Sequence, residues 1–311
     1  MKRIISFSLA FTFFVAVGYF GMAITHSQGK SDQAPGGSHE LNVGAPSQNR
    51  GFALTVGGTA ATSPITNHGG PVMTGTIHVY LIWYGNWNQT NGTDTPAGQQ
   101  LVRDFVSNIG GSPHFNINTS YPGITGAVTY SGQTTDTGTK TRLTDSNIQS
   151  IVSSAITSGR LPKDSSGVYF VLTSSNVTAS SGFCTQYCGW HTYATISGSN
   201  IKYSFVGNAA RCINSCAAQT TSPNGNAGVD GMISVITHEL EEAASDPNLN
   251  AWYDASGAEN ADKCAWTFGH FQYQVANGSW ANVHLGTRDY LIQRNLLHGT
   301  SDFCMVDATH N

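Results

Sequence analysis

Two apolar runs bounded by glycine constrain the fold of this chain more than any other feature. They extend from Gly75 to Gly85 and from Gly167 to Thr173, and both are rich in β-branched and aromatic residues. Runs of this length and composition predict buried strands. The core of the protein is therefore expected to contain a sheet.

Other segments show the patterns of helices or of shorter strands. Three helices are expected: Gln99 to Ile109, a segment capped by Asp145 or Ser146 and ended by Gly159, and about Asp230 to Ser245. Shorter strands are expected at 126–131 and 201–206. Strands and helices alternate early, and loops dominate after residue 245. This order predicts a single mixed α+β domain with a loop-rich, disulfide-stapled C-terminal part.

The N-terminus has the pattern of a signal peptide. Lys2 and Arg3 precede an apolar run that ends in small residues near Ala23, so residues 1–23 are interpreted as a secretory signal, with an uncleaved membrane anchor as the alternative. Residues 24–68 are polar and rich in Gly, Ser, Asn, Gln and Pro, which predicts a flexible lead-in or pro-segment. Residues 69–311 are then of a size for one domain.

All six cysteines lie after residue 180, and an even number behind a secretory signal favours three disulfides. The candidates are Cys184, Cys188, Cys212, Cys216, Cys264 and Cys304. The alternative is a zinc site, because CTQYC and CINSC form two C-x3-C pairs. We favour disulfides, since exported thiols oxidise and the spacing differs from the C-x2-C of zinc ribbons. The sequence does not give the connectivity.

Charge bears on the class of partner. Lys and Arg total 14 against 18 Asp and Glu, for a net charge of −4, and no basic run occurs. A nucleic-acid partner is therefore not expected, and neither is membrane contact after signal cleavage. We expect a secreted, extracellular protein. Five N-x-S/T sequences would accept glycans in a host that glycosylates: Asn88, Asn91, Asn118, Asn176 and Asn277.

The segment HELEEAASDP, residues 238–247, concentrates acidic residues in a chain that is only 10% charged. On a helix His238 and Glu242 lie one above the other and can bind one cation. Glu239 is turned aside, where it can act as a general base on a water that the metal activates. The segment corresponds to the zinc-binding sequence H-E-x-x-H with glutamate in place of the second histidine, so it predicts a zinc site.

A third ligand is expected from the acidic residues that follow the helix. We favour Glu259, because a loop after a zinc-binding helix can return a carboxylate to its open face; Asp262, Asp246 and Asp254 are the alternatives. A solvated helix face remains the simpler interpretation of the whole cluster. For Asp246 the simpler role is a helix stop, since it precedes Pro247.

Other candidate residues carry weaker signals. His78, within an apolar strand, is expected to be a core residue, and His191, in an expected loop, is more often structural than functional. His191 or Tyr253 is a candidate to stabilise an oxyanion. Trp83 and Trp87 form an aromatic cluster, for which core packing is the default and a carbohydrate-stacking surface the alternative. No G-x-S-x-G sequence supports a serine nucleophile.

Several segments together resemble the phosphate-induced protein 1 (EXORDIUM) family. They are 69–87, 167–174, 183–189, 205–208 with Cys212 and Cys216, and 228–232, and the resemblance runs in order to Cys304. It implies a secreted, wall- or matrix-associated protein linked to growth, without an established biochemical activity. It offers no metal ligands to carry over, because a leucine- and alanine-rich helix is expected at residues 238–247 in plant members.

That segment is instead similar to the H-E-x-x-E-A-x-x-D-P stretch of bacterial secreted metallopeptidase-like proteins. The chain thus resembles a microbial EXORDIUM member with a zincin-like helix. We expect a zinc-dependent hydrolase that acts on peptides, with Glu239 as the general base. The alternative is a non-catalytic cell-wall protein that binds polysaccharide through exposed aromatic side chains.

Overall fold

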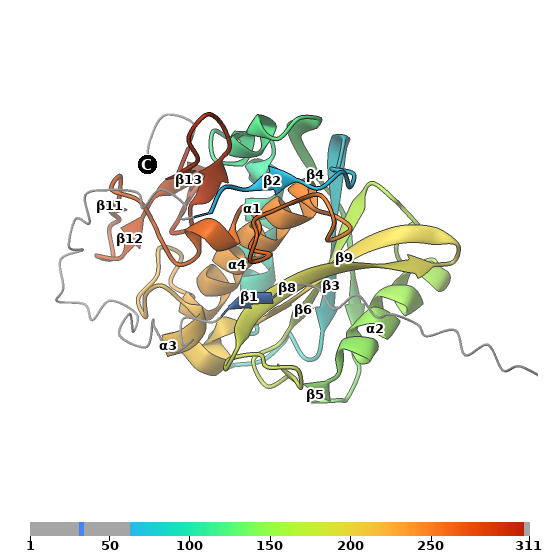
Figure 1. Cartoon of the computed structure of the whole chain (residues 1–311). Helices are drawn as coiled ribbons and strands as arrows, with labels where there is room; N and C mark the ends of the chain where they lie inside the picture. The colour runs from blue at the N-terminus through green and yellow to red at the C-terminus, as the bar shows by residue number, and fades with distance from the viewer. Residues whose placement is uncertain (1–30, 34–62, 308–311) are drawn as a thin grey trace, which may run out of the picture.

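The computed structural model describes residues 31–33 and 63–307 (Figure 1). The signal peptide predicted for residues 1–23 and most of the predicted lead-in lie outside these ranges. The described chain forms one six-stranded mixed sheet with helices on both faces and short strands around it. The predicted α+β domain is therefore confirmed.

The large sheet has the strand order β1-β8-β9-β6-β3-β4. In that order its strands are β1 (Ser31–Gln33), β8 (Tyr187–Ile196), β9 (Ser199–Gly207), β6 (Gly167–Thr173), β3 (Gly75–Tyr84) and β4 (Ile124–Asp136). Strands β9, β6, β3 and β4 run parallel to one another. Strand β8 is antiparallel to β9, and β1 is antiparallel to β8.

The two apolar runs are the central strands β3 and β6, as predicted. Strand β3 pairs with β4 on one side and with β6 on the other, and every residue of β6 is buried. A parallel strand with helices over both faces has no solvated side, so its apolar residues run continuously instead of alternating.

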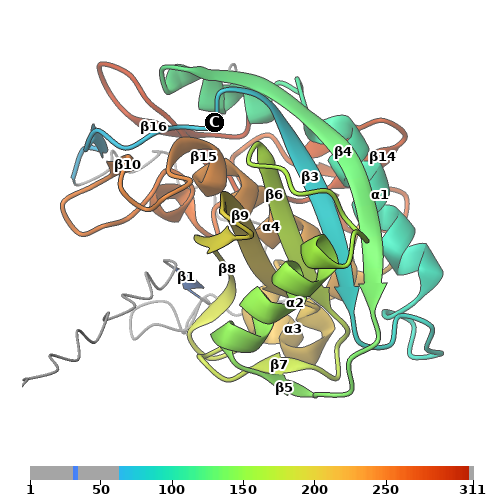
Figure 2. The same ribbon diagram turned by 90° about the vertical axis from the view of Figure 1, so that its right-hand side faces the viewer.

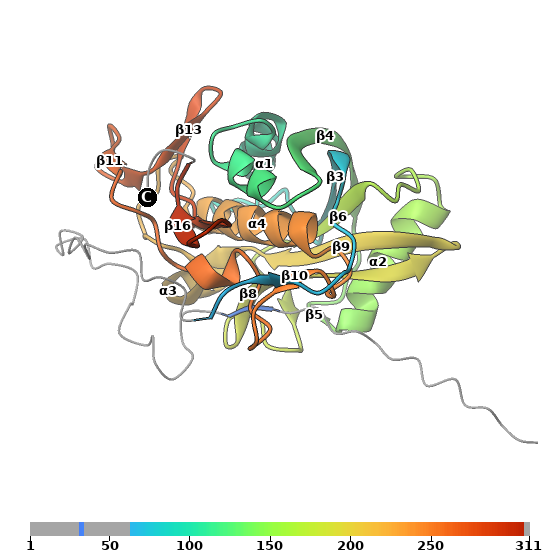
Figure 3. The ribbon, with the colours of Figure 1, turned by 45° about the horizontal axis from the view of Figure 1, so that its top comes forward.

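The order in which the chain forms the strands decides which face of the sheet each helix covers. Their bounds are α1 (Pro96–Ile109), α2 (Asp145–Thr157), α3 (Ile213–Cys216) and α4 (Ala227–Ser245), with 3-10 turns η1 (Phe115–Ser120), η2 (Ala209–Cys212) and η3 (Asp262–Cys264). The chain passes from β3 through α1 to β4, and then returns through α2 to β6 on the other side of β3. Because parallel crossovers are right-handed, α2 covers one face, and α1 covers the opposite face together with α4 (Figures 2 and 3).

The helix starts are set by side-chain caps. Thr95 accepts a hydrogen bond from the Gly98 N–H, and Pro96 occupies the first turn of α1. Helix α2 begins with a capping box formed by Thr144 and Asn147. The predicted cap at Asp145 or Ser146 was therefore wrong by a residue, because the threonine before them makes the reciprocal bonds.

The C-terminal part is rich in loops, as predicted, and short two-stranded ladders form there and elsewhere in the domain. These are β2 (Thr66–Asn67) with β10 (Trp252–Tyr253), β5 (Arg142–Leu143) with β7 (Thr178–Ala179), β11 (Tyr273–Gln274) with β12 (Trp280–Ala281), β13 (Val283–Leu285) with β14 (Arg288–Tyr290), and β15 (Asn295–Leu297) with β16 (Phe303–Met305). Strand β2 lies before residue 69, and Ile65 beside it is buried, so the last residues of the predicted lead-in pack against the domain.

The six cysteines form three disulfides: Cys184–Cys212, Cys188–Cys216 and Cys264–Cys304. The first joins the loop before β8 to η2, the second joins the start of β8 to α3, and the third joins η3 to β16. The disulfide prediction is confirmed, and the alternative of a cysteine zinc site is excluded. Within residues 31–33 and 63–307, no helix is both long and apolar enough to cross a membrane.

Strand β8 was not predicted, and His191 lies within it rather than in a loop. The sequence YCGWHTYATI mixes a glycine and a cysteine with polar residues, so it lacks both the alternation and the continuous apolar run of a strand. The strand forms because it pairs along β9 and is covered by α4 (Figure 3).

Helix α4 is buried on all sides from Gly228 to Ser245. It lies against β8 and β9, and it also packs on α1, α3 and η1. At Gly231 the neighbouring chain approaches so closely that an added Cβ would lie 2.7 Å from the Cys216 carbonyl oxygen. Position 231 therefore requires glycine for this close contact, although alanine has the higher helix propensity.

We predict that Gly231→Ala destabilises the protein. Overpacking of a close backbone contact costs about 1–3 kcal/mol, more than the gain of about 1 kcal/mol in helix propensity. Urea unfolding measures the difference. The control is Ser107→Ala on the exposed face of α1, where the change is expected to stay within about 0.5 kcal/mol. A Gly231→Ala protein as stable as wild type would contradict the prediction.

Candidate metal centre

The acidic segment at the end of α4 faces the protein interior. Glu239, Glu241, Glu242 and Asp246 are each at most 1% exposed, and so is His238. The interpretation of the segment as a solvated helix face was therefore wrong. Buried carboxylates need partners that compensate for lost hydration. The contacts of each side chain thus decide what the segment does.

His238 and Glu242 lie together as the helical spacing predicts. Nε2 of His238 is 3.1 Å from Oε1 of Glu242. Asp262, at the start of η3, approaches the same pair: its Oδ1 is 3.6 Å from Nε2 of His238, and its backbone N–H donates to Oε1 of Glu242 at 3.1 Å. Asp262 is the most exposed of the three, with 19% of its side chain accessible.

A second histidine completes the cluster from the sheet. Nε2 of His191 on β8 lies 3.5 Å from Oε2 of Glu242 and 3.1 Å from Oε2 of Glu259. The two oxygens of Glu242 thus face two different histidines. We call the five residues His191, His238, Glu242, Glu259 and Asp262 the α4–β8 cluster.

The spacing of the donor atoms in the cluster fits a metal ion. Two ligands about 2.1 Å from zinc at a tetrahedral angle lie about 3.4 Å apart. The four histidine–carboxylate separations range from 3.1 to 3.6 Å. The two longest exceed ordinary hydrogen-bond distance. The donor atoms form two groups, His191–Glu242–Glu259 and His238–Glu242–Asp262, and within each group they lie within 4.8 Å of one another.

The predicted ligands are brought together in part. His238 and Glu242 are adjacent, and Glu259 and Asp262 both join the cluster, but Glu259 is grouped with His191 rather than with His238. Asp246 lies apart from both groups. Its Oδ1 accepts hydrogen bonds from the backbone N–H groups of Asn250 and Ala251, at 2.5 and 2.7 Å, so it orders the turn after α4.

Asp254 belongs to a separate ion pair. Its Oδ2 lies 2.5 Å from Nζ of Lys263, and its Oδ1 accepts hydrogen bonds from Ser256 and from the Ala258 N–H. Burial alone would raise the pKa of Asp254, but the hydrogen bonds from Lys263 and Ser256 hold it well below its ordinary value. Asp254 is thus charged and already paired with a lysine.

We predict that Asp254→Asn costs about 2 kcal/mol at neutral pH, since it leaves a buried ammonium without its counter-charge. A depressed folded-state pKa stabilises the fold above the unfolded value of about 4, and this contribution is lost as the pH falls. The difference from wild type should therefore shrink between pH 6 and pH 3 in urea unfolding.

The matched control is Asp136→Asn, which removes a half-exposed pair with Arg160 at 3.7 Å. A pair of this kind contributes about 0–1 kcal/mol. Equal losses in the two variants, or a loss in Asp254→Asn that grows towards acid pH, would contradict the assignment.

Glu239 lies against the same strand as His191. A Cβ added to Gly189 would lie 2.9 Å from Oε1 of Glu239, so the carboxylate packs where β8 has no side chain. Because residues two apart on a strand share a face, Gly189 and His191 both face α4. The expected base therefore lies beside the cluster.

Glu241 is paired with a histidine that the sequence analysis did not consider. Nε2 of His114 lies 2.8 Å from Oε1 of Glu241, with both side chains 1% exposed. Burial alone would lower the pKa of His114, but the charge of Glu241 and a bond to the Val306 carbonyl raise it. Burial raises the pKa of Glu241 as well, against the charge of His114. This pair anchors α4 to the C-terminal segment.

The remaining sequence candidates lie elsewhere. The ring of Tyr253 stacks on His68 with a centroid separation of 3.6 Å, and His78 pairs with Asp164 at 2.6 Å. Trp83 and Trp87 are 1% and 5% exposed, so the aromatic cluster is core and offers no stacking surface. His191 was expected in a loop, with a structural role favoured, but it lies on strand β8. Only recognition of β8 as a strand would have indicated that His191 reaches the cluster.

The conserved region of phosphate-induced protein 1 matches residues 65–290. The chain belongs to the phosphate-induced protein 1 family. The EXORDIUM resemblance is thereby confirmed, while the resemblance to metallopeptidase-like proteins and the microbial origin stay predictions.

Three plant relatives illustrate the match. The chain is 35% identical over 271 residues to protein EXORDIUM-like 3 of Arabidopsis thaliana, which covers 73% of this chain and 78% of that protein. It is 32% identical over 240 residues to EXORDIUM-like 5 of the same plant, covering 65% and 64%. With protein PHOSPHATE-INDUCED 1 of Nicotiana tabacum the identity is 24% over 244 residues, covering 66% and 73%. No solved structure matches the chain.

Proposed function

We propose that this EXORDIUM-family protein is a secreted metal-dependent hydrolase whose α4–β8 cluster binds zinc. The proposal rests on one observation: two histidines and three carboxylates from α4, β8 and residues 259–262 converge in the interior, at separations that would suit the ligands of a zinc ion. Three disulfides fit the oxidising compartment that secretion implies.

Charge balance supports a cation in this cluster. Glu242 and Glu259 are fully buried, and Asp262 is largely so. A divalent ion would neutralise the carboxylates and fix the orientation of both rings.

The chemistry would be shared between the ion and the side chains around it. Bound zinc acidifies a water and polarises a carbonyl group. His191 and His238, with Glu242 between them, would hold the ion from two elements of the fold. Asp262 is the most exposed residue of the cluster, so a substrate would approach from its side. Glu239 would act as the general base: its carboxylate would take a proton from the attacking water and pass it to the leaving amine of a peptide bond.

We predict that protein purified without a histidine tag contains about one equivalent of zinc. His238→Ala and His191→Ala should both reduce the metal content severalfold or more, because each removes an imidazole ligand. Elemental analysis by mass spectrometry measures the content. The matched control is His78→Ala, a histidine that pairs with Asp164 outside the cluster; it should keep the wild-type content. Wild-type protein without bound metal would overturn the proposed site.

We predict that Glu239→Gln keeps the metal and the fold but lowers hydrolysis by roughly 10²–10⁴-fold, the usual effect of losing a general base. Turnover of a quenched fluorescent peptide library by wild type and variant measures this, with zinc content as the control. Equal turnover would exclude Glu239 as the base. A wild type that binds zinc but cleaves no peptide would contradict the peptidase activity alone.

A non-catalytic role in glycan binding is the second candidate. The sequence suggested that sugars could stack on Trp83 and Trp87, but both rings are buried, so stacking on them does not support this role. A different feature does: a cavity that lies apart from the α4–β8 cluster and is lined mostly by amide and hydroxyl side chains.

A further inference from the structure

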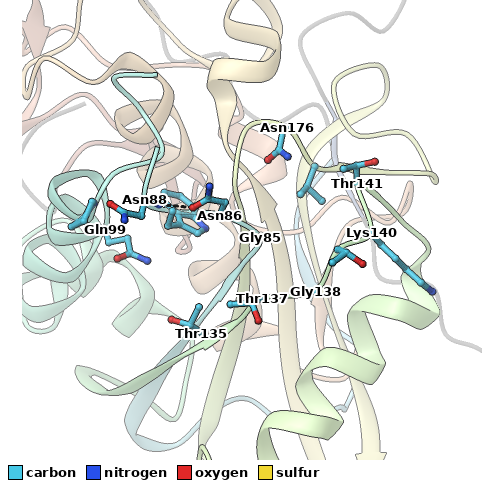
Figure 4. A pocket seen from close by; sticks show the side chains of 14 residues that line it. Gly85, Asn86, Asn88, Gln99, Thr135, Thr137, Gly138, Lys140, Thr141 and Asn176 are labelled. Atoms are coloured by element: carbon cyan, nitrogen blue, oxygen red, sulfur yellow. Dashed lines mark hydrogen bonds between the residues drawn. The ribbon is translucent and has the colours of Figure 1, made fainter. Parts of the chain in front are cut away.

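A cavity of about 660 Å³ opens at the carboxyl ends of strands β3 and β4. Its walls are the segments 85–88 after β3, 135–141 around the end of β4, and 176–177 after β6, together with the first turns of α1 (Figure 4). It shares no residue with the α4–β8 cluster. Its size is within the range of about 300–1,000 Å³ that small-ligand sites occupy.

The position of the cavity follows from the sheet topology. After β3 the chain passes to α1 on one face, and after β4 it passes to α2 on the other. The two connections diverge and leave a crevice between the carboxyl ends of the strands. In open parallel sheets this switch point is where ligands bind.

The cavity is lined mostly by uncharged polar residues. Amide side chains from Asn86, Asn88, Gln99 and Asn176 and the hydroxyls of four threonines face it, as the labelled side chains in Figure 4 show in part. Lys140 is the only charged residue among those that line the cavity, and none of them is a carboxylate. Such groups donate and accept hydrogen bonds in about equal number, which suits a ligand rich in hydroxyl groups.

The loops that carry these groups are held in place. Gly85 leaves β3 with φ +89°, where an added Cβ would lie 2.3 Å from Oγ of Ser174, so only glycine fits this turn. Its N–H donates to the carbonyl of Asp136 at 3.0 Å. Oδ1 of Asn86 accepts from the Asn88 N–H at 2.9 Å. The walls are therefore tied to one another before any ligand binds, which lowers the entropic cost of binding.

The lining also has an apolar part. Apolar atoms make up more than half of the exposed surface of the cavity, and Pro96 and Val177 are among the residues that line it. A sugar ring carries hydroxyl groups at its edge and C–H groups on its faces. A lining that mixes amides and hydroxyls with apolar atoms therefore suits a sugar.

We propose that this cavity binds a neutral oligosaccharide, with Gln99, Asn88 and Thr137 bonding to its hydroxyl groups. An acidic ligand would find a single ammonium at the rim, and an apolar ligand would leave the amides unpaired. A sugar chain pairs with the amides through its hydroxyl groups and covers the apolar lining with its C–H groups. The site does not depend on the proposed metal centre.

The test uses full-length mature protein produced without N-glycosylation, because Asn88 and Asn176 at the rim lie in N-x-T sequences. An array of neutral and acidic cell-wall oligosaccharides is the probe, and calorimetry then measures the affinity of the strongest neutral binder. Gln99→Ala removes one amide from the partly exposed wall. It should weaken binding about tenfold, the effect of one lost hydrogen bond.

Thr137→Ala, at the exposed rim, should weaken binding by a similar factor without disturbing the core. The matched control is Gln100→Ala, the next residue on α1, which is exposed and lies outside the cavity; its affinity should equal that of wild type. Binding to no neutral oligosaccharide, binding to acidic ones alone, or wild-type affinity in both Gln99→Ala and Thr137→Ala would overturn the proposal.

Discussion

The complete burial of α4 is the constraint on which the rest of the structure depends. A helix that is covered on every side cannot leave its charged groups to water, so the fold must bring a partner to each of them. Glu241 receives His114, which follows α1, and Asp246 receives the backbone of the turn after the helix. Asp230, in the first turn, accepts hydrogen bonds from Asn224. The polar contacts of α4 thus fix the positions of segments far apart in the sequence.

Glu242 has the most demanding position on this helix. Its two oxygens face His238 and His191 and accept the N–H of Asp262, so the carboxylate connects helix, sheet and loop. Disulfides lie close to both outer elements: Cys188 precedes His191 on β8, and Cys264 ends the turn that Asp262 begins. Cross-links near a site reduce the entropy lost in ordering it. The disulfides therefore stabilise the geometry that metal binding would use.

The two proposed sites have opposite electrostatic character. The α4–β8 cluster is acidic and buried, whereas the cavity beyond β3 and β4 is neutral and open at its amide-lined rim. They are built on different parts of the same sheet, one on the antiparallel strand β8 and one at the carboxyl ends of parallel strands. A secreted protein with both would hold a carbohydrate at one place and carry out hydrolysis at another.

The sequence by itself determined the local structure. The continuous apolar runs gave β3 and β6, helical periodicity gave α1, α2 and α4, and the even cysteine count gave three disulfides. The i, i+4 spacing placed His238 beside Glu242, because four residues make about one helical turn. Each of these depends on residues near one another in the chain or on composition.

The tertiary structure alone decided the partners of those residues. Strand β8 has no clear pattern of its own and forms by pairing with β9, so the arrival of His191 at Glu242 could not be read from spacing. The sequence did not indicate the pairing of His114 with Glu241, which lie 127 positions apart in the chain. For the same reason it did not indicate the burial of Trp83 and Trp87. Contacts between distant segments arise from packing around a shared core, and the periodicity of one segment does not predict which other segment packs against it.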